Sequence, residues 1–192
     1  VSGPRRLKTV RMRTVFNLLG PLTNPAGASA QVVGVYDASL TELMARALGE
    51  LGVRRALVVH GADGLDEISI AGETYVAELR DGAVRRYTVT PEDFGLHRAP
   101  LEAIRGGDAK HNAEVIHKIF GRSAHNHRLH GPLREIVLAN AAAALLVAGR
   151  ARDFLEGVRL AAKSIDSGAA GERLEALVAF SQGKKSQGLA AS

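Results

Sequence analysis

Apolar residues in the first third of the chain form strand-like runs separated by a helix-like stripe. Gln31 to Tyr36 is a short valine-rich run, which is typical of a buried strand. Over residues 39–51 the apolar positions recur every three or four residues, and Ser39 with Glu42 has the spacing of a capping box. A second buried run covers 56–59. Strand, helix and strand with short connections predict a βαβ unit with a parallel pair and a right-handed crossover.

Two further strands follow this unit. Thr74 to Leu79 and Val84 to Val89 flank Asp81-Gly82, a dipeptide typical of a tight hairpin turn. The antiparallel pair makes the predicted sheet mixed. The Gly-punctuated, acidic segment from His60 to Glu67 comes directly after the second parallel strand. Open α/β sheets bind ligands beyond the carboxyl ends of their strands, so this segment is the first place to expect a site.

The rest of the chain has helical patterns. Longer helices are expected over 108–120, 132–148, 152–165 and 172–180. A short apolar helical turn over 15–19 is expected to stop at Gly20-Pro21, because proline cannot continue a helix.

These patterns predict an α/β fold with a mixed, mainly parallel sheet flanked by helices. The α/β domain is expected over 31–182. Residues 1–30 are expected to be a basic leader and the remnant of a helical domain or linker. The Gly/Ser/Lys-rich residues 183–192 are expected to form a disordered tail.

Composition narrows the class of protein. The 192 residues contain no cysteine, which excludes disulfides and thiolate chemistry. No apolar run reaches the roughly 20 residues of a membrane span, so a cytoplasmic protein without membrane contact is expected. The formal net charge of +5 suits an anionic partner. Aromatic residues make up only 4% of the chain and no basic stripe stands out, so a nucleic-acid partner is not favoured.

Four stretches carry a family resemblance. They are Arg13–Pro25 (RTVFNLLGPLTNP), His60–Ser69 (HGADGLDEIS), Gly106–Ala109 with Asn112-Ala113, and Asn140–Ala144. Together they resemble anthranilate phosphoribosyltransferases from about Arg13 to Gln182. The resemblance implies the large α/β domain of the nucleoside phosphorylase and phosphoribosyltransferase type. It also implies a Mg²⁺-dependent enzyme of tryptophan biosynthesis, which transfers the phosphoribosyl group of 5-phosphoribosyl 1-diphosphate to the amine of anthranilate.

The chain departs from that family in what it lacks. The family's Gly-Thr-Gly-Gly-Asp loop for the diphosphate and its Lys-His-Gly-Asn segment are both absent. Both belong ahead of Arg13, so the chain is expected to be the carboxy-terminal part of the enzyme, with little activity alone. The resemblance implies a homodimer for the full-length enzyme.

Asp66 and Glu67 are the candidate metal ligands. Mg²⁺ takes hard oxygen ligands, typically one or two protein carboxylates, and neutralises a polyanionic leaving group. On the residues alone an exposed acidic loop is the simpler interpretation, and the resemblance assigns the pair to Mg²⁺. Asp63 fits better as a turn former beside Gly64.

Arg13 is the candidate for binding the carboxylate of anthranilate. A guanidinium matches a planar carboxylate bidentately and stays charged. On the residues alone Arg13 is interpreted as one of several surface arginines, and the resemblance gives it this substrate-binding role. No catalytic residue is assigned, because an aromatic amine is unprotonated at neutral pH and needs no strong general base.

Other features invite weaker functional interpretations. Gly106-Gly107-Asp108 is interpreted as a helix start, since an Asp cap opposes a bound anion. The cluster of His125, His127 and His130 has no evident fixed geometry for a metal, and His60 is interpreted as a structural histidine. A pyrimidine nucleoside phosphorylase-like enzyme and a non-catalytic relative that binds nucleic acid are the alternative functions.

Overall fold

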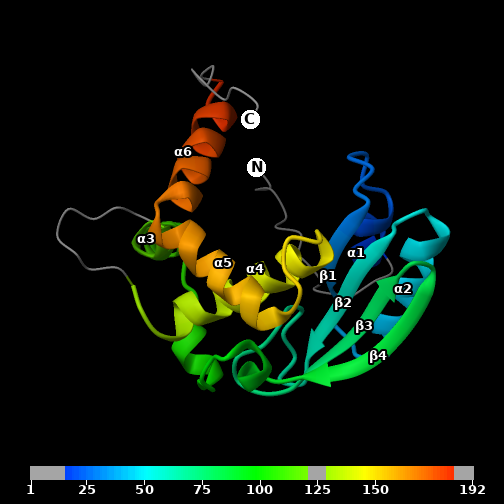
Figure 1. The fold of residues 1–192 in the computed structure, drawn as a ribbon. Helices are drawn as coiled ribbons and strands as arrows, with labels where there is room; N and C mark the ends of the chain where they lie inside the picture. The colour runs from blue at the N-terminus through cyan, green and yellow to red at the C-terminus, as the bar shows by residue number, and fades with distance from the viewer. Residues whose placement is uncertain (1–15, 121–128, 184–192) are drawn as a thin grey trace, which may run out of the picture.

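A single four-stranded sheet organises the protein. The computed structural model describes residues 16–120 and 129–183. The strands lie side by side in sequence order (Figure 1). They are β1 (Ala30–Gly34), β2 (Arg55–Gly61), β3 (Thr74–Arg80) and β4 (Ala83–Val89).

Strand pairing confirms a mixed sheet. β1 pairs with β2 in parallel, with Val32 opposite Leu57, whereas β2–β3 and β3–β4 are antiparallel. Of the three strand pairs in the described residues, one is parallel. The sheet is therefore mixed, as expected, but it is not mainly parallel. The reason is the connection after β2, where the chain returns by a loop and then by a tight hairpin rather than by helical crossovers. Asp81 and Gly82 form that hairpin with φ of 50° and 82°.

Helices cover both faces of this sheet. The α-helices are α1 (Phe16–Leu22), α2 (Leu40–Glu50), α3 (Ala109–Phe120), α4 (Pro132–Val147), α5 (Phe154–Asp166) and α6 (Ala169–Ser181). Two short 3-10 helices are η1 (Pro91–Phe94) and η2 (Leu101–Ile104). Figure 1 shows α2 on one side of the sheet and α4 with α5 on the other. No helix in the described ranges, 16–120 and 129–183, is long and apolar enough to cross a bilayer.

The two faces of the sheet bury two separate apolar cores. Successive residues of a strand point to opposite faces. Ala56 and Val58 of β2 accordingly join the core under α2, while Leu57 and Val59 join the core under α4. Because both faces are covered, β2 needs apolar residues at consecutive positions. That requirement explains the continuous apolar run in the sequence.

Two local expectations were wrong. Helix α1 continues through Gly20-Pro21 to Leu22, since the Thr23 N–H and hydroxyl both donate to the Leu19 carbonyl and close the last turn. Ser39 lies at the N-terminus of α2 but makes no capping hydrogen bond. Its N–H and hydroxyl both donate to Asp37 Oδ1, at 2.9 and 2.7 Å. Because Asp37 engages this serine, the predicted capping box does not form.

Candidate metal site

The segment that joins β2 to β3, residues 62–73, forms an acidic loop. It begins at the carboxyl end of β2. Gly64 has a φ of 95°, a conformation open mainly to glycine, and its N–H donates to the Gly61 carbonyl at 2.9 Å. The Gly61 N–H donates to the Leu65 carbonyl at 2.8 Å. These bonds turn the chain sharply and bring residues 66 and 67 back beside the sheet.

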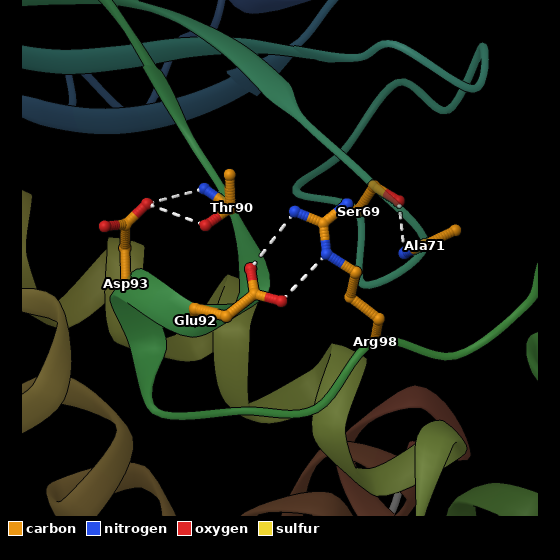
Figure 2. A network of polar contacts seen from close by, with 6 residues as sticks. All are labelled: Ser69, Ala71, Thr90, Glu92, Asp93 and Arg98. Carbon is orange, nitrogen blue, oxygen red and sulfur yellow. Dashed lines mark hydrogen bonds and ion pairs between the residues drawn. The ribbon is translucent and has the colours of Figure 1, made fainter.

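Asp63 is committed to the turn itself. Its Oδ1 accepts a hydrogen bond from the Leu65 N–H at 3.1 Å, and its Oδ2 accepts one from the Ser69 hydroxyl. Ser69 in turn accepts from the Ala71 N–H at 2.8 Å (Figure 2). The prediction that Asp63 forms the turn is confirmed. Its carboxylate is occupied by the loop's own backbone and side chains.

Two isoleucines anchor the second half of the acidic loop. Ile68 and Ile70 are 1% and 0% exposed and belong to the core beneath α4. Between them Ser69 is also buried, and its N–H donates to Thr74 Oγ1 at 3.0 Å. The Ile70 carbonyl accepts from the Ala99 N–H at 3.0 Å. The loop is thus held by packing and hydrogen bonds, although it contains no regular secondary structure.

The segment that precedes Ala99, the residue hydrogen-bonded to Ile70, is stabilised by contacts of its own. It follows η1, which begins with a capping box in which Asp93 accepts from the N–H and hydroxyl of Thr90 (Figure 2). Glu92 and Arg98 then close the turn with an ion pair at 2.8 Å, also drawn in Figure 2. This ion pair, with the Glu92 backbone and Thr90, lowers the pKa of the Glu92 carboxyl to about 2. This segment leads directly to Ala99, which bonds to the acidic loop.

Asn140 of α4 fastens the acidic loop from the helix side. Its Oδ1 accepts from the Ile68 N–H at 3.0 Å, and its Nδ2 donates to the Ile68 carbonyl at 3.0 Å. The same Nδ2 donates to the Ile136 carbonyl within α4, also at 3.0 Å. The amide therefore ties helix to loop immediately after Glu67. Asn140 belongs to a stretch of family resemblance, but no local signal in the sequence indicates this role.

Gly34, the last residue of β1, lies against the acidic loop from the sheet side. A Cβ at this position would collide with the backbone carbonyl of Asp66. The backbones of β1 and the loop approach so closely only because residue 34 has no side chain. Nearby, His60 Nδ1 is hydrogen-bonded to the Val35 carbonyl at 2.8 Å, which confirms its interpretation as a structural histidine.

Asp66 and Glu67 lie next to these contacts with Gly34 and Asn140. The Asp66 side chain is exposed and the Glu67 side chain is half-buried. Within the part of the chain that the structure describes, neither carboxylate has a hydrogen-bond or ion-pair partner. Burial raises the pKa of the Glu67 carboxyl, and the negative charges of Asp66 and Asp63 raise it further. Among the described residues, no cation therefore compensates the charges of this pair.

The chemistry of these donors fits Mg²⁺. Two carboxylates leave room for the waters and substrate oxygens that complete a magnesium shell. Among residues 16–120 and 129–183, no cluster of three or more Asp, Glu or His residues could hold a metal by itself. A transition-metal cage of protein ligands is therefore not formed in that part of the molecule.

Several predicted features fall elsewhere. Arg13, His125 and His127 lie outside the described residues. His130 is exposed just before α4. Asp108 caps α3 as predicted, because its Oδ1 accepts from the His111 N–H at 2.8 Å, so the Gly106-Gly107-Asp108 segment is a helix start.

Comparison with known proteins gives the family. The family described as "Glycosyl transferase family, a/b domain" matches residues 3–171. This chain belongs to that glycosyl transferase family. The match spans the whole sheet and the acidic loop.

Relatives of this glycosyl transferase domain share one name. The chain is 56% identical over 173 residues to the anthranilate phosphoribosyltransferase of Symbiobacterium thermophilum, covering 90% of this chain and 49% of the relative. It is 52% identical over 179 residues to that of Moorella thermoacetica, covering 93% and 50%. The resemblance to anthranilate phosphoribosyltransferases is confirmed. The chain spans about half the length of these curated relatives.

Solved structures agree on the fold of this glycosyl transferase domain. Anthranilate phosphoribosyltransferase from Thermus thermophilus superposes with a TM-score of 0.77 at 46% identity, covering 88% of this chain and 48% of that one. The Saccharomyces cerevisiae enzyme in complex with PRPP and Mg superposes with a TM-score of 0.71 at 28% identity, covering 85% and 45%.

Proposed function

We propose that this chain supplies the metal-binding carboxylates of an anthranilate phosphoribosyltransferase. The enzyme would join the amine of anthranilate to C1 of 5-phosphoribosyl 1-diphosphate and release diphosphate. The observation that carries the proposal is the pair Asp66 and Glu67. Their carboxylates are adjacent, lack a cationic partner among the described residues, and belong to a loop fixed at the carboxyl end of β2. Relatives of this name at about 50% identity support it.

The chemistry of the reaction explains why such a pair is needed. The leaving diphosphate carries several negative charges, which a bound Mg²⁺ would neutralise. Asp66 and Glu67 would hold the ion, and the partial burial of Glu67 and the repulsion between the two carboxylates would favour its binding. The raised pKa of Glu67 reflects that burial and repulsion, and a divalent cation would relieve the repulsion. Positioning of both substrates would supply most of the remaining rate.

Further parts of the proposal rest on the relatives. The Saccharomyces cerevisiae enzyme has been crystallised with 4-fluoroanthranilate, and separately with PRPP and Mg. By analogy, Arg13 of this chain would receive the carboxylate of anthranilate through its guanidinium. The complete enzyme would work in the cytoplasm as a homodimer.

Manganese titration tests the metal site directly. Mn²⁺ replaces Mg²⁺ in oxygen sites, and its free ion is measured by electron paramagnetic resonance. The unmodified chain should bind Mn²⁺, and the double variant Asp66→Asn with Glu67→Gln should not. Glu172→Gln with Glu175→Gln makes the same charge change on exposed acids of α6 and should leave binding intact. Equal binding by the Asp66/Glu67 variant would remove the assignment.

A further inference from the structure

The amide of Asn140 makes an unusually complete set of contacts for a side chain beside a loop. An asparagine offers one acceptor oxygen and an NH₂ group with two donors. Here the oxygen takes the Ile68 N–H, and the NH₂ group donates to the carbonyls of Ile68 and Ile136, all at 3.0 Å. Both donors and the acceptor are therefore used. The two bonds to Ile68 connect residues 72 positions apart in the sequence.

The hydrogen bonds between Asn140 and Ile68 constrain the backbone at Glu67. The Ile68 N–H belongs to the peptide unit that also contains the Glu67 carbonyl, and peptide units are planar. An acceptor that holds this N–H therefore sets the orientation of the backbone leaving Glu67. The preceding peptide unit, which joins Asp66 to Glu67, contains the Asp66 carbonyl that lies against Gly34. The peptide unit before Glu67 is thus packed against β1, and the peptide unit after it is hydrogen-bonded to α4.

Helix α4 is a firm base for this contact. Ala139, which precedes Asn140, is 1% exposed, and Ala142 and Ala143 are both 0% exposed in the core against the sheet. Close-packed interiors do not yield easily to small displacements. The amide of Asn140 therefore contacts the loop from a helix whose position is fixed by close packing.

We infer that Asn140 is a positioning residue for the divalent-cation site formed by Asp66 and Glu67. This inference rests on the proposed function. Asn140 does not touch the cation; it holds the Glu67–Ile68 peptide so that the two carboxylates point to one ion. Groups that orient metal ligands commonly change metal affinity roughly ten- to a hundredfold when they are replaced.

Two substitutions at residue 140 separate positioning from other effects. Asn140→Leu keeps the approximate size and removes every hydrogen bond. Asn140→Asp keeps the acceptor for the Ile68 N–H but faces the carbonyls of Ile68 and Ile136 with a second acceptor. Its negative charge would attract a cation more strongly, whereas its lost donors would release the loop. Positioning therefore predicts weaker binding in Asn140→Asp, and simple electrostatics predicts stronger binding.

The chain contains a matched control. Asn112 of α3 makes the same two-bond contact with one backbone residue, accepting from the Gly107 N–H at 2.8 Å and donating to the Gly107 carbonyl at 3.1 Å. That contact lies at the start of α3 and away from the acidic loop. Asn112→Leu removes an equivalent pair of bonds without touching the proposed cation site.

The deciding experiment is Mn²⁺ titration by electron paramagnetic resonance, with amide hydrogen exchange at Ile68 measured on the same samples. We expect roughly ten- to a hundredfold weaker Mn²⁺ binding and faster Ile68 exchange in both Asn140 variants, and no change in Asn112→Leu. Circular dichroism identifies a variant that fails to fold. If one Asn140 variant does not fold, the Mn²⁺ affinity of the other tests the inference. Unchanged affinity in a folded Asn140 variant would overturn this inference alone. Absence of Mn²⁺ binding by the unmodified chain would overturn the proposed metal site as well.

Discussion

The backbone carbonyl of Asp66 lies in the space beside Gly34 that a side chain would otherwise fill. This contact joins the end of β1 to the residue that begins the acidic pair. It makes the geometry of the candidate metal site depend on a glycine 32 positions earlier in the sequence. A displacement of either segment should therefore be felt by the other.

Gly34→Ala should destabilise the fold and displace the acidic loop. The added methyl group meets backbone rather than a flexible side chain, so strand or loop must move, at a cost of about 1–3 kcal/mol. Urea denaturation measures the loss, and Mn²⁺ titration should show weaker binding. Gly72→Ala is the control, because it lies in the same loop with open space around it and should change stability by less than about 0.5 kcal/mol. Equal stability of the two variants would contradict the close approach.

Glu67→Gln should raise the melting temperature at neutral pH when no divalent cation is present. Folding raises the pKa of this carboxyl, through burial first and then through Asp66 and Asp63. The folded state therefore binds the proton more tightly, and ionisation of Glu67 lowers stability as pH rises above the ordinary carboxyl pKa. The advantage of Glu67→Gln should disappear as pH falls below that value, because Glu67 is then protonated in both states.

The same two proteins test the role of the cation. Mg²⁺ should stabilise the unmodified chain and reduce the advantage of Glu67→Gln, since a divalent cation offsets the repulsion. Melting curves at several pH values with and without Mg²⁺ measure both effects. Glu172→Gln, on an exposed part of α6, provides the comparison for a general charge change. A pH-independent difference in melting temperature between the unmodified chain and Glu67→Gln would argue against the electrostatic explanation.

Gly157→Ala should destabilise the packing of α5 on α4. A Cβ at Gly157 would lie 2.8 Å from the Ala142 Cβ and 2.9 Å from its backbone oxygen. Helix propensity alone predicts a gain of about 1 kcal/mol, whereas overpacking predicts a loss of about 1–3 kcal/mol. Because Ala142 is fully buried against the sheet, we expect the loss to dominate in urea denaturation. Gly49→Ala in α2 meets only the terminal methyl groups of Leu79 and should be much better tolerated.

The 192-residue chain by itself should turn over little anthranilate. It spans about half the length of its relatives, and its sequence has no Gly-Thr-Gly-Gly-Asp segment. Poor placement of one substrate can lower a rate by about a hundredfold or more. Loss of anthranilate fluorescence with PRPP and Mg²⁺ measures the rate. A rate comparable to that of the Thermus thermophilus enzyme would show that this chain holds the diphosphate without such a segment.

Local sequence signals were sufficient for much of the fold. The parallel unit of β1, α2 and β2 follows from apolar periodicity, and the hairpin follows from Asp81-Gly82. Asp63 could be recognised as a turn former because Gly64 follows it. Each of these depends on residues close together in the chain, where steric and hydrogen-bonding preferences act directly.

Contacts between distant segments were not predictable in the same way. Nothing near Asn140 in the sequence indicates that its amide binds Ile68, 72 residues away. Nothing near Gly34 indicates that Asp66 will lie against it. A local signal can also mislead. The sequence around Ser39 predicts a capping box, but the Ser39 hydroxyl donates to the carboxylate of Asp37 instead. The acidic pair was proposed as a metal site from the family resemblance, whereas the groups that contact its backbone could be identified only from the structure.

Ile68 and Ile70 belong at once to the acidic loop and to the main apolar core. Binding of an ion at the proposed site would therefore be thermodynamically linked to global unfolding, because the chain could not unfold its core around these residues without also releasing the ion. At a free ion concentration of about 100 times Kd, such linkage contributes about 2.7 kcal/mol to the folded state. Under the proposed assignment, the melting temperature of the domain would rise with the concentration of free magnesium, whether or not the enzyme turns over.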